Sequence, residues 1–272
     1  MAKPVVFFIR GLSTYGRDTA KWSVFDFGPV YKNLALALSR EEIEFYPVVG
    51  LGAGSLSVIA DRAVEFLKQH PVWNDTTREV HLLGQSAGGL VLRLALPKLN
   101  RRPRSAVTIA SPHRGSRLAE ICTSMPVENP GTAKFLRAFG YDVDERIHLF
   151  SELAPSGLSA IFGYDVTSTE PEAALGKHLE INSLSLASIV CHTPSRHWCW
   201  PIWTMHRLPA FKNFARESDG FIERHSQPFG QVLAEIGIDH FRQMGMFKPG
   251  RHFHELISVL SRHFHSFSDN PR

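Results

Sequence analysis

The chain has little that points to a membrane protein or a disulfide-stabilised protein. No apolar stretch approaches the ~20 residues that a membrane span needs. The apolar run at residues 5–9 is too short for a secretory signal and lacks a small-residue cleavage site. The three cysteines, Cys122, Cys191 and Cys199, favour a reducing cytoplasm over a disulfide framework because their number is odd, although a bridge between Cys191 and Cys199 stays open. We therefore expect a cytoplasmic protein.

The patterns that mark nucleic-acid and metal sites are missing as well. The net charge is +4, and the cationic side chains are spread along the chain apart from one cluster at residues 101–104. A basic stripe, which nucleic-acid-binding proteins typically have, is absent. Cys191, His192, His197 and Cys199 lie close together, but their spacing fits no paired zinc pattern. We expect no nucleic-acid partner, no metal and no cofactor.

What the sequence does contain is an alternation of short apolar runs with segments of helical periodicity. The runs that predict strands are residues 5–9, 43–49, 80–83, 105–109, 186–191 and 231–236. The segments that predict helices are residues 30–39, 57–69, 88–96 and 252–265. This alternation predicts an α/β fold with a mostly parallel sheet and helices on both faces. A length of 272 residues suits one domain of that kind over residues 1–272.

The alternation of predicted strands and helices stops between about residues 114 and 185. This stretch contains glycine, proline and scattered apolar side chains, and an insertion of this length predicts a cap or lid; ordinary helices on the sheet edge are the alternative. Three tryptophans follow at Trp198, Trp200 and Trp203. They line an apolar substrate cleft in one interpretation and pack their own loop against the core in the other.

The segment Gly84-Gln85-Ser86-Ala87-Gly88 lies between a predicted strand and a predicted helix. A serine on a sharp strand-to-helix turn needs neighbours without bulky side chains, and Gly84 and Gly88 supply that room. The segment therefore predicts a nucleophile elbow with Ser86 at its tip, whereas a plain glycine-rich turn is the alternative.

Such a serine is inert unless a base removes its proton and an acid orients that base. With an elbow of this kind the acid and then the base follow the serine along the chain. We choose Asp219, in a loop and followed by glycine, as the acid, with Glu217 as the alternative. We choose His240, just after the last predicted strand, as the base, with His225 as the alternative.

Most of the 14 histidines have simpler explanations. His81 is expected to alternate out of a strand, and His252, His254, His263 and His265 are expected on the surface of the last helix. The oxyanion hole should use two backbone amides, that of Ala87 after the nucleophile and that of Leu12 after the first strand, where Gly11 lets the chain turn.

Several segments together resemble the successive landmarks of the α/β-hydrolase superfamily, nearest the bacterial triacylglycerol lipases. They are residues 5–12, 84–89, 108–116, 218–220 and 239–240, and the most specific is Ser-Pro-His-Arg-Gly-Ser at 111–116. The resemblance covers most of the chain outside the predicted lid. It implies hydrolysis of carboxylic esters through an acyl-enzyme, with Ser86, Asp219 and His240 as the triad.

Three positions depart from that family. The lipases usually have histidine where this chain has Arg10 and Gln85. These two replacements do not alter the backbone N–H groups expected in the oxyanion hole, so they bear on substrate preference. Secreted relatives that hold a structural calcium have aspartate two residues beyond the catalytic histidine, and this chain has Arg242 there. A calcium site is therefore not expected.

The sequence thus predicts a lipase or esterase that acts on a small-molecule or lipid ester, with transient contact with a lipid interface. A thioesterase or acyltransferase would use the same triad, and a polyester depolymerase falls within the ester class. A non-catalytic lipid-binding protein of the same fold is the alternative of a different class.

Overall fold

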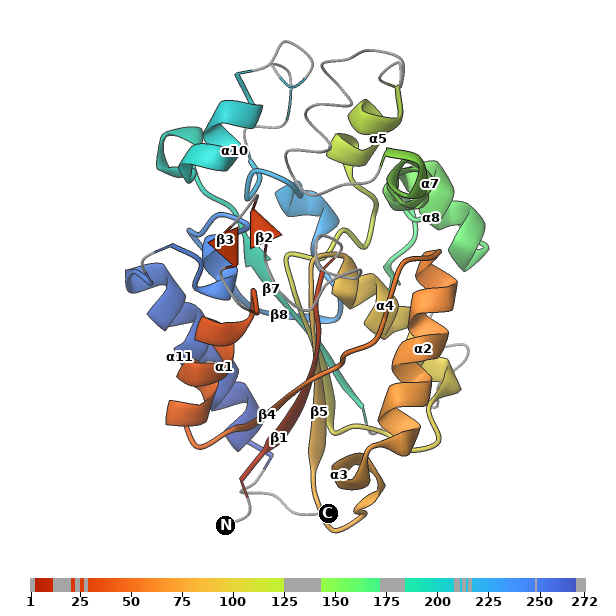
Figure 1. Cartoon of the computed structure of the whole chain (residues 1–272), viewed down its shortest axis with the longest axis vertical. Helices are drawn as coiled ribbons and strands as arrows, with labels where there is room; N and C mark the ends of the chain where they lie inside the picture. Colours follow the sequence, from red (N-terminus) through yellow and green to blue (C-terminus); the bar gives the residue numbers. More distant parts are fainter. Residues whose placement is uncertain are drawn as a thin grey trace.

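A six-stranded sheet forms the centre of the computed structural model, which describes residues 3–11, 21–22, 25–26, 29–124, 143–171, 184–207, 211, 214, 217–247 and 249–267 (Figure 1). Its strand order is β4-β1-β5-β6-β7-β8, and every neighbouring pair is parallel. The strands are β1 (Val5–Ile9), β4 (Glu44–Pro47), β5 (Val80–Gln85), β6 (Ser105–Ile109), β7 (Ser185–Cys191) and β8 (Gln231–Ile236). The α/β fold class expected from the sequence is confirmed.

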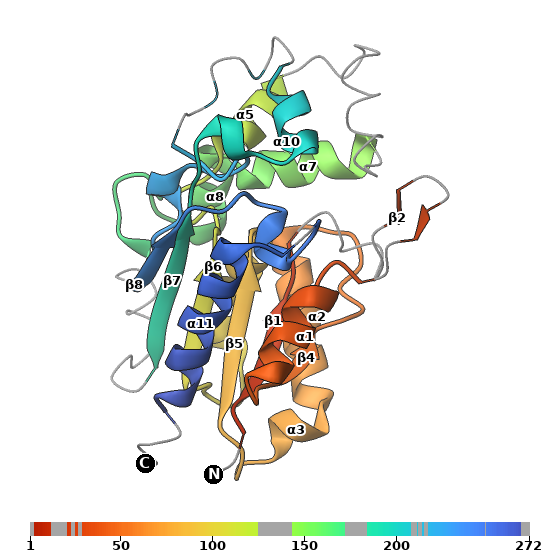
Figure 2. The ribbon, with the colours of Figure 1, turned by 90° about the vertical axis from the view of Figure 1, so that its left-hand side faces the viewer.

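Helices cover both faces of this sheet because side chains of consecutive strand residues point to opposite faces. The helices α1 (Lys32–Arg40) and α11 (Arg251–His265) lie on one face, and α2 (Leu56–Gln69) and α4 (Ala87–Ala95) lie on the other (Figures 1 and 2). Phe7 of β1 belongs to the apolar cluster with α2 and α4, whereas its neighbour Phe8 belongs to the cluster with α1 and α11. The two apolar layers therefore hold the sheet between them.

The terminal helix α11 shows how closely periodicity predicts packing. The sequence places five apolar side chains on one face of this helix, and the fold buries all five: Phe253, Leu256, Ile257, Leu260 and Phe264. His81 corrects an expectation, because it is 1% exposed rather than facing out of its strand. Its Nδ1 lies 2.8 Å from Ser105 Oγ, and burial lowers its pKa to about 3.

Several short elements have no counterpart in the expected pattern. They are the antiparallel pair β2 (Lys21–Trp22) and β3 (Phe25–Asp26), and the helices α3 (Pro71–Asn74), α5 (Arg117–Ser124), α7 (Val143–Leu153), α8 (Pro155–Phe162) and α10 (Trp200–Met205). The helices α5, α7 and α8 connect β6 to β7, within the stretch at about 114–185 where the sequence predicts no strand. In the described part of the chain, no helix is long and apolar enough to span a membrane.

The carboxyl ends of the parallel strands meet at one edge of the sheet, and α5 and α10 lie beyond that edge (Figure 1). A third apolar cluster occupies this region and joins α5 to α10; its buried members are Leu118, Cys122, Met205, Phe211 and Phe214. Ser86 follows β5 at the same edge, and His240 follows β8. Residues distant in sequence therefore meet where open α/β sheets bind their ligands.

Candidate active site

Ser86 occupies a strained turn between β5 and α4. Its φ is 57° and its ψ is −134°, a backbone conformation that costs a non-glycine residue about 1–3 kcal/mol. A Cβ on Gly84 would lie 2.6 Å from Gly89 Cα, and a Cβ on Gly88 would lie 2.1 Å from the Ile9 carbonyl oxygen. Both glycines are therefore required for the close approach of this turn to its neighbours. The turn projects Ser86 Oγ beyond the edge of the sheet.

His240 lies between Ser86 and Asp219. Its Nε2 is 3.0 Å from Ser86 Oγ, and its Nδ1 is 2.6 Å from Asp219 Oδ2. The backbone N–H of His240 also donates to the Asp219 carbonyl at 2.9 Å. The Phe221 ring stacks on the imidazole with a centroid separation of 4.9 Å. The imidazole is thus held at both nitrogens and on one face, in the geometry in which it can accept the serine proton.

The Asp219 carboxylate is fully buried, and hydrogen bonds orient it. Its Oδ1 accepts the backbone N–H groups of Phe221 at 2.9 Å and Ile222 at 2.8 Å. Buried Gln227 ties this loop to the end of β7, since its Nε2 donates to the carbonyls of Ile222 and Cys191. A carboxylate removed from water requires such donors. The loop therefore presents Oδ2 to the imidazole.

The two alternative partners lie elsewhere. Glu217 is exposed and pairs with Arg224, and His225 is exposed in the 3₁₀ turn Arg224–Ser226. The fold brings Ser86, Asp219 and His240 together and leaves both alternatives outside this group.

One of the two expected oxyanion donors, Ala87, lies on the elbow. Ala87 is the first residue of α4, so its N–H has no acceptor within the helix. Leu12 lies outside the described residues. Gly11, the residue before it, packs against the nucleophile so closely that a Cβ there would lie 2.8 Å from Ser86 Cβ. The end of β1 therefore runs directly beside Ser86.

Two glutamines complete the polar surroundings. Gln85 Nε2 lies 3.4 Å from His240 Nε2 and donates to Gln243 Oε1 at 3.1 Å. Gln243 Nε2 donates to Asp219 Oδ2 at 2.7 Å. The sequence singles out Gln85 only as a departure from a family pattern, and it gives Gln243 no role. No signal in the neighbouring sequence could have found Gln243, because its partners Gln85 and Asp219 are distant along the chain.

The segment after β6 packs around a buried histidine. His113 is fully buried, stacks on Phe229 with a centroid separation of 4.5 Å, and lies 3.2 Å from Thr108 Oγ1 through its Nε2. Burial, with Arg93 and Arg114 nearby, lowers its pKa well below the usual value. His113 is therefore neutral at physiological pH and supports the α4 side of the elbow as a packing residue.

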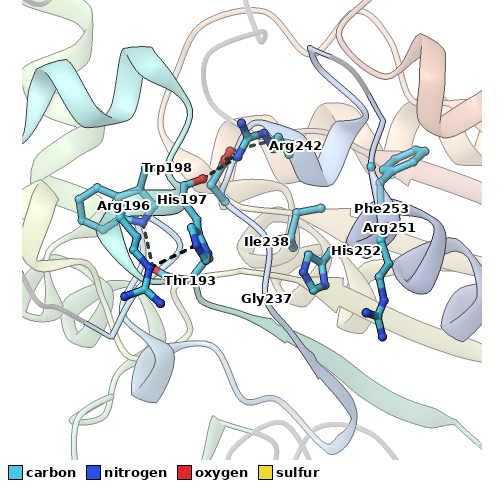
Figure 3. Close-up of a pocket in the computed structure, with 12 residues that line it drawn as sticks. Thr193, Arg196, His197, Trp198, Gly237, Ile238, Arg242, Arg251, His252 and Phe253 are labelled. Carbon is cyan, nitrogen blue, oxygen red and sulfur yellow. Dashed lines mark hydrogen bonds and ion pairs between the residues drawn. The ribbon is translucent and has the colours of Figure 1, made fainter.

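Arg242 fixes the loop that carries His240. Its Nη1 lies 3.0 Å from Asp239 Oδ2 and donates to the His197 carbonyl at 2.6 Å. Figure 3 shows Arg242 in this position at one side of a cavity of about 470 Å³, with Arg196, Arg251 and His252 around the rest of its wall. Burial raises the pKa of Asp239, and the nearby guanidinium opposes that effect. Arg242 thus forms an ion pair with the buried carboxylate of Asp239, the residue before the candidate base His240.

The described residues contain no group of three or more histidine, cysteine or acidic side chains placed to hold a metal ion. Cys122, Cys191 and Cys199 are all free and buried, so the disulfide that the sequence left open between Cys191 and Cys199 is not formed. Burial raises the pKa of the Cys199 thiol to about 12.

The parallel sheet with helices on both faces, and the serine on a strained turn after its central strand, define an α/β-hydrolase fold. Solved structures of hydrolases have the same fold. The chain is similar to a metagenomic carboxyl esterase with 13% identity and a TM-score of 0.65, over 98% of this chain and 76% of that one.

Two bacterial lipases are also similar. The mature lipase BlEst2 of Bacillus licheniformis has 14% identity and a TM-score of 0.63, over 95% of this chain and 92% of that one. The Staphylococcus hyicus lipase has 16% identity and a TM-score of 0.55, over 99% and 95%. No protein-family model and no curated protein matches the sequence. These identities establish the fold, and the resemblance expected from the sequence is confirmed at that level.

Proposed function

We propose that this protein is a serine hydrolase that cleaves carboxylic esters through an acyl-enzyme. The observation that carries the proposal is the continuous hydrogen-bonded path from Ser86 Oγ through His240 to the buried carboxylate of Asp219, with distances of 3.0 and 2.6 Å. The strained backbone of Ser86 supports it, because strain of this kind is retained where the surroundings enforce it for function.

The mechanism follows from the roles of the three groups. His240 Nε2 takes the proton of Ser86 as Oγ attacks the ester carbonyl carbon, and Asp219 holds Nδ1 and stabilises the imidazolium. The amides of Ala87 and Leu12 bind the oxyanion. His240 then protonates the departing alcohol. Water attacks the acyl-serine with His240 again as base, and this step releases the acid and restores Ser86.

The helices between β6 and β7 form part of a cap over this site in our proposal. The third apolar cluster supports it, because it joins α5 to α10 beyond the carboxyl edge and includes the partly buried Phe221, the ring that stacks on His240. An acyl chain that enters between these helices would meet apolar side chains next to the base. This arrangement favours esters of apolar acids, with contact with a lipid interface through the cap.

The test is hydrolysis of a p-nitrophenyl ester series from acetate to palmitate, with matching thioesters alongside. We expect turnover that Ser86→Ala lowers by about 10⁴-fold or more. Turnover of the longer esters defines a lipase, and turnover confined to acetate defines an esterase without the apolar acyl site. Turnover of thioesters alone would replace the ester assignment. If no substrate is turned over by the wild type, the proposed function is wrong.

The matched controls are variants of His225 and Glu217, the two alternative partners that lie outside the site. His240→Gln and Asp219→Asn should each lower kcat by several orders of magnitude, whereas His225→Gln and Glu217→Gln should retain wild-type rates. Equal losses at His225 and His240 would contradict the assignment of the base.

A further inference from the structure

The two glutamines beside the triad form a closed hydrogen-bonded circuit with it. Gln243 Nε2 donates to Asp219 Oδ2 at 2.7 Å, Gln85 Nε2 donates to Gln243 Oε1 at 3.1 Å, and Gln85 Nε2 lies 3.4 Å from His240 Nε2. Gln243 is fully buried and Gln85 is 6% exposed. Amides withdrawn from water in this way have no solvent alternative to these partners, so their orientation is determined by the circuit.

The carboxylate of Asp219 sets the direction of every bond in this circuit. An ionised carboxylate only accepts hydrogen bonds, so Gln243 must turn its NH₂ group toward Oδ2 and its carbonyl oxygen toward Gln85. Gln85 must then present its own NH₂ group, of which one hydrogen serves Gln243 and the second points toward His240. The negative charge of Asp219 therefore determines the orientation of both side-chain amides.

The same charge fixes the imidazole from its other side. Asp219 Oδ2 accepts from Nδ1 of His240 at 2.6 Å, so Nδ1 carries a hydrogen and Nε2 is the acceptor. An N–H on Nε2 would face the N–H of Gln85, a donor against a donor. In the resting enzyme both edges of the ring thus favour the tautomer that carries its hydrogen on Nδ1 and presents the Nε2 lone pair to Ser86 Oγ.

Resting on the proposed function, we propose that Gln243 and Gln85 are positioning residues that relay the orientation set by the Asp219 carboxylate to the far edge of His240, and that they hold the resting imidazole in the tautomer whose Nε2 lone pair faces Ser86. Gln243 holds the carboxylate in the plane of the imidazole, and Gln85 holds the imidazole edge. Neither side chain exchanges a proton. The relay acts on the rate of the chemical step and leaves substrate binding unchanged.

Four variants test this relay. Gln243→Met and Gln85→Met keep the side-chain length and remove the amide. Gln85→Glu keeps the shape but reverses the polarity, because its carboxylate has no N–H to give to Gln243 Oε1. The double variant with methionine at both positions tests whether the two residues act in series. Ser105→Ala is the control, since it removes a buried side-chain contact with His81 at the opposite end of the strands.

We expect Gln243→Met to lower kcat for a p-nitrophenyl ester about tenfold with KM unchanged, the size expected for one hydrogen bond to a charged group. Gln85→Glu should lower kcat further than Gln85→Met. The double variant should be no slower than Gln243→Met within about twofold, because Gln85 loses its orientation once Gln243 is gone. Ser105→Ala should lower the Tm and leave kcat at the wild-type value.

The relay is refuted if the losses in kcat of the two single methionine variants multiply in the double variant. It is also refuted if Gln85→Glu and Gln85→Met have the same kcat. Losses in KM with falls in Tm like that of Ser105→Ala would also overturn it and leave a packing role. A wild type that turns over no ester would remove the proposed function instead. In that case ¹⁵N chemical shifts of the His240 imidazole still decide. The relay requires the Nδ1–H tautomer in the wild type and the same shift toward the Nε2–H tautomer in Gln85→Met and Gln243→Met, and unchanged shifts in these two variants refute it.

Discussion

Glu223 provides a quantitative prediction because its carboxyl group is buried beside the candidate acid. Its Oε1 accepts the backbone N–H of Arg117 at the start of α5. Its Oε2 is buried without a hydrogen-bond partner among the described residues. Burial first, and then the charges of Asp219 and Glu120, raise the pKa of Glu223 to about 7. The carboxyl group is therefore largely protonated in the folded protein at mildly acidic pH.

The sign of the effect on stability follows from proton binding. The usual pKa is 4.5, so between pH ~4.5 and ~7 the unfolded chain has lost a proton that the folded chain retains. The stabilising contribution is fully present below pH ~4.5 and is lost as the pH rises through ~7. The difference between the two pKa values corresponds to about 3 kcal/mol of unfolding free energy.

Glu223→Gln removes this dependence because glutamine resembles the protonated acid at every pH. We expect the stability of the variant, relative to wild type, to rise by about 2 kcal/mol between pH 5 and pH 8 in urea unfolding, or roughly 4–8 °C in Tm. Exposed Glu217→Gln is the matched control and should follow the wild-type curve. Parallel pH dependences for Glu223→Gln and wild type would contradict a raised pKa of Glu223 in the folded protein.

Three further predictions concern the elbow, the Arg242 contact and the thiols. Ser86→Gly should be more stable than Ser86→Ala by about 1–2 kcal/mol in thermal unfolding, because glycine relieves the positive φ, and equal stabilities would argue against strain. Arg242→Gln should cost about 1–2 kcal/mol at pH 8 and less at pH 4, where protonation of Asp239 removes the charge left unpaired, and a pH-independent loss would show that the ion pair is not the cause. Native protein should react negligibly with a thiol reagent at pH 8, since burial raises the pKa of Cys122 and of Cys199 to about 12 and that of Cys191 well above its usual value. Rapid reaction of any native thiol would contradict that burial, whereas the unfolded chain should expose all three cysteines.

The sequence predicts the inner strands well because strands buried on both faces, such as β1 and β6, are continuous apolar runs. The expected bounds of β1, β6 and β8 agree with the observed strands residue for residue, and α11 differs by one residue at its start. The position of His240 was also accessible, since it closely follows the apolar run of β8, whereas Asp219 lies in the long connection from β7 to β8 and was chosen as a loop aspartate before glycine. Their roles in catalysis stay predictions.

The features that the sequence does not predict depend on contacts between segments that are distant along the chain. His81 alternates as an outward residue of β5, but Phe264 of α11 packs against it with a centroid separation of 5.0 Å and buries it. Gln243 has no local signal, because its role arises only when the turn after His240 meets Gln85 of another strand. The helices α7 and α8 are less amphipathic than α2 and α4, so the spacing of their apolar residues marks them less clearly in the sequence.

Labelling with a fluorophosphonate probe, with the adduct mapped by mass spectrometry, asks directly whether His240 and Asp219 activate Ser86. We predict one adduct on Ser86, none in Ser86→Ala, and a rate that falls by orders of magnitude in His240→Gln but not in His225→Gln. A folded wild-type protein that stays unlabelled, or an adduct on another residue, would contradict the claim that His240 and Asp219 activate Ser86.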